Sequence, residues 1–393
     1  MNRKEPSQNP LFHVVINNEG QYSLWPAGEK IPPGWQKTAF AGNKEECLAF
    51  IQREWTDMTP RSLREFAPDP SARTYQDNQQ DGLAHHFFVE QAAKTPDAIA
   101  VVFKDQQITY KDLHHYSNQI GNYLQEIGVT PEKAVGLCVG RSIEMIAGFL
   151  GILKSGGVYV PLDPLYPAER LKTMIHESHL TALLVQEEFL ADLAVTTACI
   201  CSIDRDRELI AKKSIENVES PITPQNLSHI IFTSGSTGTP KGVMMPHATL
   251  SANLTGFMDK VKIHPEDRYL HTASLAFTSS LRQILAPLSC GARIVIADQE
   301  QRTNPLALFT LINTEKVTIW DTVAPFWETC TKSLLQKSPA TRNEFLENSL
   351  RLILSSGGEL PRSLIQTWRE LSAKKVRLLN MYGQTETVGN ILI

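Results

Sequence analysis

From about Leu83 onward, short apolar runs alternate with amphipathic segments, and this alternation limits the folds open to the chain. The expected strands cover Ala98–Phe103, Ala134–Val139, Val158–Leu162, Ala182–Val185, His229–Thr233, Ala292–Ala297, Val317–Trp320, Leu352–Leu354 and Val376–Leu379. Helical spacing predicts helices over Tyr110–Ile127 and Ile143–Lys154 between them. Strands separated by helices form α/β domains with mostly parallel sheets, which bind ligands at the carboxyl ends of the strands.

Residues 1–64 have a different texture and predict a small α+β domain. They hold three of the six tryptophans, and large aromatic side chains supply most of the core of so small a domain. We expect strands over Phe12–Asn17 and Ser23–Trp25, followed by a helix over Lys44–Trp55. The apolar face of that helix carries Cys47, Leu48, Ile51 and Trp55. Residues 65–82 are polar and are expected to form a linker.

Composition excludes several classes of protein. The 38 basic and 42 acidic residues give a net charge of −4, which argues against a nucleic-acid or membrane partner. The N-terminus lacks an apolar signal segment, and the longest apolar stretch, Met145–Leu153, is too short to span a membrane, so we expect a cytoplasmic protein. The six cysteines form no CxxC pair. The adjacent pairs His85–His86 and His114–His115 are expected to point to different sides of a helix with no third ligand nearby.

A Gly-, Ser- and Thr-rich loop directly follows the strand His229–Thr233. It reads Thr233-Ser-Gly-Ser-Thr-Gly-Thr-Pro-Lys-Gly242. Glycines let successive backbone N–H groups converge on an anion, the hydroxyls add donors, and Lys241 adds a positive charge. The spacing differs from that of a P-loop. A flexible surface loop is the alternative, but the residues on both sides favour a polyphosphate site.

Four segments in the same order resemble one known family. They are Ile108-Thr-Tyr-Lys-Asp-Leu113, Leu153-Lys-Ser-Gly-Gly-Val-Tyr-Val-Pro-Leu-Asp163, the loop above, and Asn380-Met-Tyr-Gly-Gln-Thr-Glu386. They are similar to the motifs of the ATP-dependent adenylate-forming enzymes, and within them to the adenylation domains of nonribosomal peptide synthetases. Gln384 replaces the proline of the last motif. The resemblance covers residues 83–393 and implies the large adenylate-forming core of that family.

The resemblance implies a ligase that joins a substrate carboxylate to the α-phosphorus of ATP and releases magnesium pyrophosphate. Thr233, Lys241, Thr385 and Glu386 would be catalytic, with Glu386 as the Mg²⁺ ligand. Tyr382 would pack on the adenine, and Gly357, Gly358 and Glu359 would line the adenine slot. The remaining ATP contacts would come from Ser234, Gly235, Ser236, Thr237, Gly238, Asn380, Met381 and Gly383. Phosphopantetheine would come from a carrier protein outside this chain.

The same resemblance places ten residues around the acid substrate. They are Phe277, Thr278, Ser279, Arg282, Asp321, Ser355, Gly357, Met381, Gly389 and Asn390. Family members that activate α-amino acids carry an aspartate where this chain has Thr278. Either the substrate therefore lacks an α-amino group, or Asp321 takes over the ammonium. Arg282 could instead neutralise Asp321, or receive an acidic substituent of the substrate.

Residues 1–64 resemble a second family, the MbtH-like proteins. The matching residues run from Asn17-Asn-Glu-Gly to Ser-Leu-Trp-Pro26, then Pro33-Gly-Trp35, Cys47-Leu48 and Trp55-Thr-Asp-Met-Thr-Pro-Arg-Ser-Leu63. The family implies a three-stranded antiparallel sheet with a helix, and a non-catalytic partner of adenylation domains. Ser23, Leu24, Trp25 and Trp35 would form the cleft that contacts the adenylation domain. An 18-residue linker keeps the two at roughly millimolar effective concentration, so we expect an intramolecular contact.

The sequence ends at Ile393, before the ribose-binding aspartate and the mobile C-terminal lid that the adenylate-forming family implies. We therefore expect a core subdomain without its lid, incomplete as an enzyme, with a carrier protein expected downstream. Two other interpretations stay open. One is a standalone acyl-CoA or aryl-acid ligase, and the other is a non-catalytic MbtH-type helper.

Overall fold

The computed structural model describes residues 11–55, 82–193, 198–234, 240–372 and 375–392. The chain forms two compact units, Met1–Asp77 and Asn78–Ile393. Gly235, Ser236, Thr237 and Gly238 of the predicted phosphate loop lie outside the described residues, as do the side chains of Ser234, Gly389 and Asn390.

The first unit is a three-stranded antiparallel sheet with one helix. The sheet order is β2–β1–β3, and its strands are β1 (Phe12–Asn17), β2 (Tyr22–Pro26) and β3 (Trp35–Gly42). Helix α1 (Lys44–Glu54) begins at a capping box in which the Asn43 side chain accepts from the Glu46 N–H. The predicted apolar face of α1 is partly wrong, because Cys47 is buried whereas Leu48 is 48% exposed. A single short helix over a three-stranded sheet buries only the part of its face that meets the strands.

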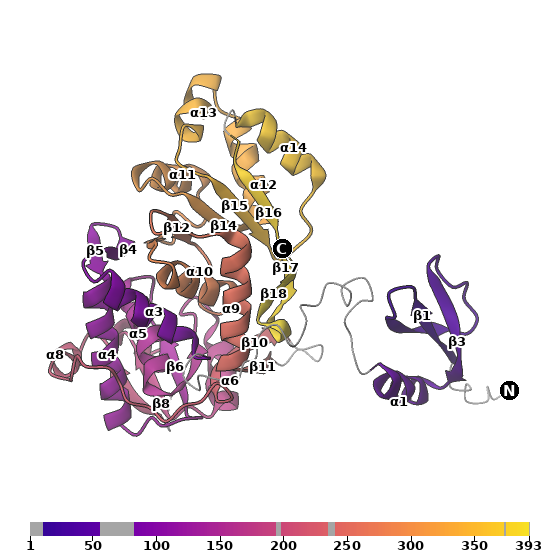
Figure 1. The fold of residues 1–393 in the computed structure, drawn as a ribbon, viewed down its shortest axis with the longest axis horizontal. Helices are drawn as coiled ribbons and strands as arrows, with labels where there is room; N and C mark the ends of the chain where they lie inside the picture. Colours follow the sequence, from indigo (N-terminus) through magenta and orange to yellow (C-terminus); the bar gives the residue numbers. More distant parts are fainter. Residues whose placement is uncertain (1–10, 56–81, 194–197, 235–239, 373–374, 393) are drawn as a thin grey trace, which may run out of the picture. The chain divides into compact units, whose positions relative to one another are not determined.

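The second unit contains two large sheets whose strands are mostly parallel, which confirms the predicted α/β class (Figure 1). The six-stranded sheet has the order β11–β10–β7–β6–β8–β9. Its strands are β6 (Ala134–Cys138), β7 (Val158–Pro161), β8 (Ala182–Val185), β9 (Cys199–Ser202), β10 (Leu227–Ser234) and β11 (Pro240–Pro246). Only β11 runs antiparallel to its neighbour among these described strands.

The seven-stranded sheet has the order β16–β15–β14–β12–β13–β4–β5. Its strands are β4 (Ile99–Phe103), β5 (Gln106–Thr109), β12 (Arg268–His271), β13 (Arg293–Ile296), β14 (Ile319–Val323), β15 (Leu352–Ser356) and β16 (Arg377–Asn380). A small hairpin of β17 (Tyr382–Gln384) and β18 (Gly389–Leu392) flanks the 3-10 turn η1 (Thr385–Thr387). Strands β5, β11, β12, β17 and β18 were not among the expected strands, because they are short or have charged and polar residues at their ends.

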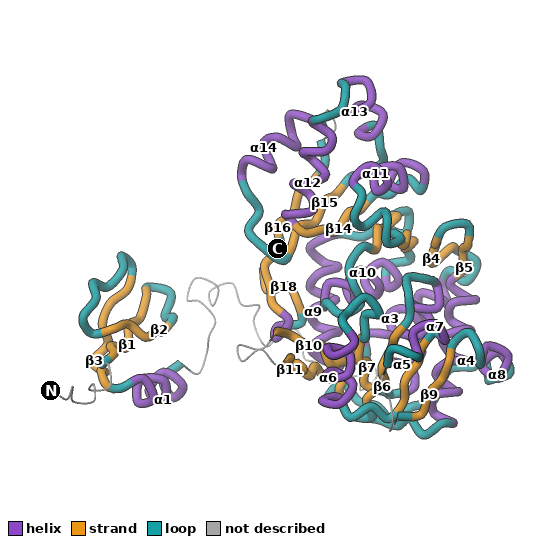
Figure 2. Tube along the Cα trace, turned by 180° about the vertical axis from the view of Figure 1, so that it is seen from behind, coloured by secondary structure: helices purple, strands orange, loops and turns teal. Residues whose placement is uncertain are grey.

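Helices cover both faces of the sheets. They are α3 (Ala84–Lys94), α4 (Tyr110–Glu126), α5 (Ile143–Ser155), α6 (Ala168–Ser178), α7 (Glu187–Leu190), α8 (Arg207–Ala211), α9 (His247–Val261), α10 (Thr278–Ser289), α11 (Pro305–Thr314), α12 (Ala324–Leu335), α13 (Pro339–Leu346) and α14 (Arg362–Leu371). Figure 2, which shows the unit from behind, displays α4 and α8 side by side. The described helices include none that is long and apolar enough to cross a membrane.

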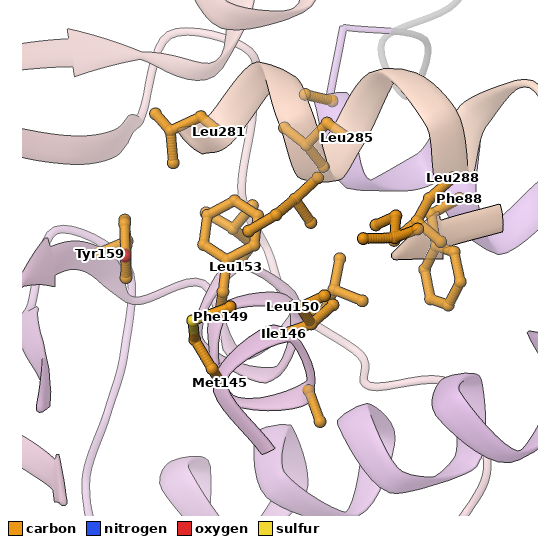
Figure 3. Close-up of a cluster of buried hydrophobic side chains, with 14 of the residues drawn as sticks. Phe88, Met145, Ile146, Phe149, Leu150, Leu153, Tyr159, Leu281, Leu285 and Leu288 are labelled. Carbon is orange, nitrogen blue, oxygen red and sulfur yellow. The ribbon is translucent and has the colours of Figure 1, made fainter. Parts of the chain in front are cut away.

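The central core joins the two sheets through helices α5 and α10. Every residue of α5 except Glu144 is buried, as expected for a helix that is apolar on all sides. Its Phe149, Leu150 and Leu153 face Leu281 and Leu285 of α10, as Figure 3 shows. The helix begins at Ser142, whose side chain accepts from the Met145 N–H.

A second core lies on the opposite face of the seven-stranded sheet and is built from aromatic side chains. Trp320 of β14 packs against Trp327 of α12 and Trp368 of α14, with ring centroids 6.4 and 6.2 Å apart. Phe309 of α11 completes this cluster. Because β14 buries Trp320 on this face, its neighbour Asp321 points to the other face, toward α10.

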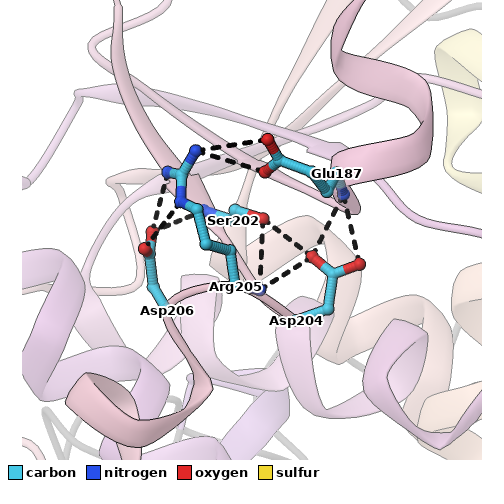
Figure 4. Close-up of polar contacts among 5 residues, drawn as sticks. All are labelled: Glu187, Ser202, Asp204, Arg205 and Asp206. Carbon is cyan, nitrogen blue, oxygen red and sulfur yellow. Dashed lines mark hydrogen bonds and ion pairs between the residues drawn. The ribbon is translucent and has the colours of Figure 1, made fainter.

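An exposed ion-pair cluster connects α7 to the turn after β9 (Figure 4). The Arg205 guanidinium lies 3.2 Å from a Glu187 carboxylate oxygen and 3.0 Å from an Asp206 oxygen. Asp204 accepts from the Glu187 N–H and from the Ser202 hydroxyl. Water screens exposed pairs of this kind, so the cluster fixes a surface turn without supporting the core.

Gly156 ends helix α5 in the left-handed conformation with φ 87°, and a Cβ there would collide with the Ser220 hydroxyl. We expect Gly156→Ala to lower the free energy of unfolding by about 1–3 kcal/mol. The matched control is Gly256→Ala in helix α9, where a Cβ meets nothing within 4 Å. That change should be neutral or stabilising, since alanine favours helix by about 1 kcal/mol. Urea unfolding of the full chain measures both, and equal effects would contradict this account.

Three buried imidazoles gather where α3, α9 and β10 meet. The His85 ring is 4.7 Å from the His86 ring and 5.6 Å from that of His247, and His229 lies fully buried nearby. Helix α9 brings the His247 ring to within 5.6 Å of the His85 ring, a proximity that the sequence alone does not reveal. Even so, the described part of the chain contains no group of three or more His, Cys, Asp or Glu that could hold a metal ion.

Burial lowers the pKa of His229 to about 3 and that of His247 to about 4, so both are neutral in the folded protein. The unfolded chain protonates them near pH 6.5, so it binds more protons as the pH falls and the folded state loses stability. We expect the loss to begin below about pH 6.5 and to reach about 1.4 kcal/mol per pH unit for each imidazole.

Urea unfolding of the full chain between pH 7.5 and 5.5 measures this slope. His229→Asn should remove one imidazole's share of the stability lost between pH 7.5 and 5.5, about 1.4 kcal/mol over the whole interval. The control is His176→Asn, which removes a side chain that is 78% exposed and should leave the slope unchanged. An unchanged slope for His229→Asn would overturn the assignment.

Candidate functional site

A cavity of about 610 Å³ opens at the carboxyl ends of β12 and β14. Helices α10 and α12 begin at its wall, and the segment before η1 closes another side. Its lining residues are Thr272, Ala273, Ser274, Phe277, Thr278, Ser279, Arg282, Gln283, Arg302, Asp321, Thr322, Val323, Pro325, Phe326, Ser356, Gly357, Gly383, Gln384 and Thr385. This location is where parallel sheets generally bind ligands.

An ion pair between α10 and β14 forms the charged part of the wall. The Arg282 side chain donates from Nε and Nη2 to Asp321 Oδ2, at 3.1 and 2.8 Å. The Tyr269 hydroxyl donates to the same oxygen at 2.9 Å. Arg282 and Asp321 are only 7% and 1% exposed. Of the alternatives that the sequence left open for Asp321, the structure contains the pair with Arg282.

Arg282 keeps its positive charge despite burial. Burial alone would lower the pKa of Arg282, but the neighbouring Asp321 carboxylate raises it above its usual value. Burial, followed by the charge of Asp321, raises the pKa of Tyr269 well above its ordinary range, so this hydroxyl remains a donor. The Arg282 guanidinium also lies 5.2 Å from the centre of the Phe257 ring.

Gln283 and Arg302 hold the loop after β12, and the sequence analysis missed both. The Gln283 amide oxygen accepts from the N–H groups of Thr272 and Ala273, and its nitrogen donates to the Asp321 carbonyl. Arg302 Nε donates to the Thr272 carbonyl at 2.7 Å. Gln283 follows Arg282 directly on a helix that borders the cavity, so its position was the available signal.

The predicted acid-pocket residues fall into three groups. Phe277, Thr278, Ser279, Arg282, Asp321 and Gly357 line the cavity. Ser355 and Met381 are buried beside the cavity but are not among its lining residues. The Met381 N–H donates a 2.7 Å backbone hydrogen bond to the Ser355 carbonyl. Gly389 and Asn390 lie on β18, and the surroundings of Gly389 and the side chain of Asn390 are outside the described part of the structure.

The predicted ATP residues lie around the same opening and at the base of the predicted phosphate loop. Tyr382 on β17 is 64% exposed, so it is not part of the core. Gly383 and Thr385 line the cavity, Gly357 has φ 76°, and Gly358, Glu359, Asn380 and Glu386 are exposed. Thr233 and Lys241 pair directly across the β10–β11 ladder.

A second, more apolar cavity of about 260 Å³ shares Ser274 and Arg302 with the first. It lies at the ends of β4, β6, β7 and β13, and Phe103, Val139, Leu165 and Phe189 contribute to its wall. The Ser274 hydroxyl donates to Asp163 Oδ2, which connects the loop after β12 to the loop after β7. The sequence analysis did not predict this cavity.

In the first unit, the four predicted contact residues lie on the two outer strands. Ser23, Leu24 and Trp25 belong to β2, and Trp35 opens β3. All four are half-buried. Trp25 pairs with His13 and Trp35 with Asn17, so the two indoles lie near opposite ends of the central strand β1.

Comparison with known proteins agrees with this geometry. The family described as AMP-binding enzyme matches residues 88–393, and the family described as MbtH-like protein matches residues 1–67. Tyrocidine synthase 3 of Brevibacillus parabrevis is 36% identical over 307 residues, which are 78% of this chain and 5% of that protein. Bacitracin synthase 3 of Bacillus licheniformis is 36% identical over 80% of this chain and 5% of its own length. The chain thus spans only a small part of these curated relatives.

Among solved structures, the nonribosomal peptide synthetase FmoA3 in its alpha-methyl-L-serine-AMP bound form superposes with a TM-score of 0.73. It is 25% identical and covers 91% of this chain, and the match covers 41% of that chain. The AMPPNP-bound form of the same protein gives a TM-score of 0.72. The chain therefore belongs to the AMP-binding enzyme family, as an adenylation domain of the nonribosomal peptide synthetase type that follows an MbtH-like domain.

Proposed function

We propose that this chain activates a carboxylic acid with ATP, as an acyl adenylate for nonribosomal peptide synthesis. The observation that carries the proposal is the cavity at the ends of β12 and β14. One wall comes from α10 and β14, and another comes from Gly383–Thr385, beside the exposed Tyr382 ring. An acid could therefore lie in the cavity with its carboxylate toward the Gly383–Thr385 segment.

The reaction needs positioning and charge stabilisation more than covalent chemistry. A carboxylate oxygen attacks the α-phosphorus of ATP, the bond from that phosphorus to the β-phosphate oxygen breaks, and pyrophosphate leaves. We assign Thr385 as a donor to an α-phosphate oxygen, because Thr385 lines the cavity and its hydroxyl can donate. The Tyr382 ring, 64% exposed, offers a face on which adenine can stack.

Thr233 and Lys241 flank the predicted phosphate loop. Because they pair across the β10–β11 ladder, both lie at the base of that loop. Lys241 is exposed, so its ammonium can reach an anion without first being desolvated. We assign the two residues to the triphosphate, with Lys241 stabilising the charge of the departing pyrophosphate.

A magnesium ion fits the residues near η1. Glu386 is an exposed carboxylate next to Thr385, and Mg²⁺ at nucleotide sites is held by one or two carboxylates together with the phosphates. Glu386 would hold the ion, which when bound would neutralise charge on the phosphates.

We assign the second cavity to the phosphopantetheine arm of a carrier protein outside this chain. Its apolar wall suits a slender chain of methylene and amide groups, and it shares Ser274 and Arg302 with the acid cavity. We further propose that the MbtH-like domain contacts the adenylation domain in cis through Ser23, Leu24, Trp25 and Trp35, all of which keep part of their surface accessible.

Tyr382→Ala tests the nucleotide site. Loss of a stacked base should raise the KM for ATP about 10- to 100-fold, because base–aromatic stacking contributes about 1–3 kcal/mol. Tyr382→Phe keeps the ring and should retain ATP binding within about twofold of that of the original chain. ATP–pyrophosphate exchange over a panel of carboxylic acids measures the effect, and calorimetric ATP binding gives an independent readout.

Leu209→Ala is the surface control, since Leu209 is 51% exposed on α8. It should behave like the original chain in both assays. If Tyr382→Ala bound ATP as tightly as the original chain, the assignment of this face to adenine would be wrong. If ATP bound to none of these proteins, the proposed function itself would fail.

A further inference from the structure

The acid cavity has three charged lining side chains among its described residues. Arg282 and Arg302 are positive, and Asp321 is the one carboxylate. The formal charge of the wall is therefore positive even before a ligand enters. A ligand that brings a further positive charge has to find compensation from Asp321.

One oxygen of the Asp321 carboxylate, Oδ2, is already shared by other donors. This oxygen accepts from Arg282 Nε, Arg282 Nη2 and the Tyr269 hydroxyl, within 3.1 Å in each case. Tyr269, Arg282 and Asp321 are all buried, so water compensates poorly for the loss of these contacts. An ammonium that competes for Asp321 leaves the Arg282 guanidinium without its counter-charge in a buried site, which is strongly unfavourable.

Arg302 adds a second positive charge to the wall, which further disfavours a bound ammonium. It is about half-buried, its Nε donates to the Thr272 carbonyl, and its Nη1 donates to the Gln299 amide oxygen. Among the described residues, no carboxylate lies within ion-pair distance of its guanidinium. The nearest acidic influence is Asp163, which lines the neighbouring cavity and accepts from Ser274.

The rest of the wall is neutral and in part apolar. Phe277 and Val323 are 57% and 43% exposed, and Phe326 lies close to Val323 on the same wall. Large apolar side chains left this exposed in a cavity favour a ligand with an apolar body. Thr278 and Ser279 add neutral hydroxyls at the start of α10.

We propose that the acid bound in this cavity carries no ammonium group and has an apolar body, as in aryl, 2-hydroxy, 2-keto or simple carboxylic acids. The inference rests on the proposed function, because it names the substrate class of the same cavity. Neutral substituents leave the Arg282–Asp321 pair intact and can bond to the Thr278 and Ser279 hydroxyls.

Matched acids test the inference in ATP–pyrophosphate exchange with the full chain. One set is phenylalanine, phenyllactate, phenylpyruvate and 3-phenylpropionate, and the corresponding leucine set varies the body. We expect the amine-free members to exceed the amino acid by on the order of a hundredfold in kcat/KM. A preference for the amino acid in every set would overturn the inference and leave the proposed function standing.

Thr278→Asp supplies an uncompensated carboxylate at the first turn of α10, where the helix N-terminus tolerates negative charge. It should move the preference toward the amino acid by about tenfold or more. The matched control is Thr278→Asn, since asparagine has the size of aspartate but no charge. This variant should keep the original preference for the amine-free acid. An equal shift in both variants would contradict the charge argument.

If exchange is undetectable, binding of matched acyl sulfamoyl adenosines, with and without the amino group, replaces it in calorimetry. Tighter binding of the amine-free compound supports the inference, and equal or weaker binding overturns it. If these compounds and ATP all fail to bind, the proposed function falls, and the inference falls with it. The two failures are thus distinguishable.

Discussion

The fold of the second unit depends on one constraint: both faces of its two mostly parallel sheets must be covered by apolar side chains. Helix α5 meets this need from inside the core, since nearly all of its residues are buried and its Phe149 and Leu153 meet Leu285 of α10. The aromatic cluster of Trp320, Trp327 and Trp368 covers the outer face of the seven-stranded sheet. With both faces closed, only the strand ends remain for function.

The candidate site follows from this arrangement. Strand β14 alternates between the two faces, so burial of Trp320 on one side turns Asp321 toward α10 on the other. The position of the ion pair is thereby set by the packing of the tryptophans. Because Arg282 and Asp321 form an ion pair and neutralise each other, they limit which charges a ligand can bring into the cavity.

The sequence predicted most of the strands and the helices that flank them, because apolar periodicity is strong where both faces of a sheet are covered. A resemblance of several consecutive residues also singled out the segment from Tyr382 to Glu386, of which Gly383, Gln384 and Thr385 line the cavity. The sequence could not decide between the partners of Asp321, because Arg282 and Tyr269 meet it only after β12 and β14 become neighbours. The exposure of Leu48 and the existence of the second cavity could not be predicted for the same reason. Both depend on which segments the fold brings close together.

Tyr269 and Arg282 donate to the same oxygen of Asp321, and this arrangement limits how the residues of the cavity can change in evolution. Tyr269, Arg282 and Asp321 contact one another, so replacing any one of them alone leaves a buried charge or donor without its partner. Their substitutions are therefore epistatic, and a lineage could reach a different charge pattern only by changing several of them together. Thr278, which stands outside this network, is free to vary one step at a time, so new acid specificities would arise there first.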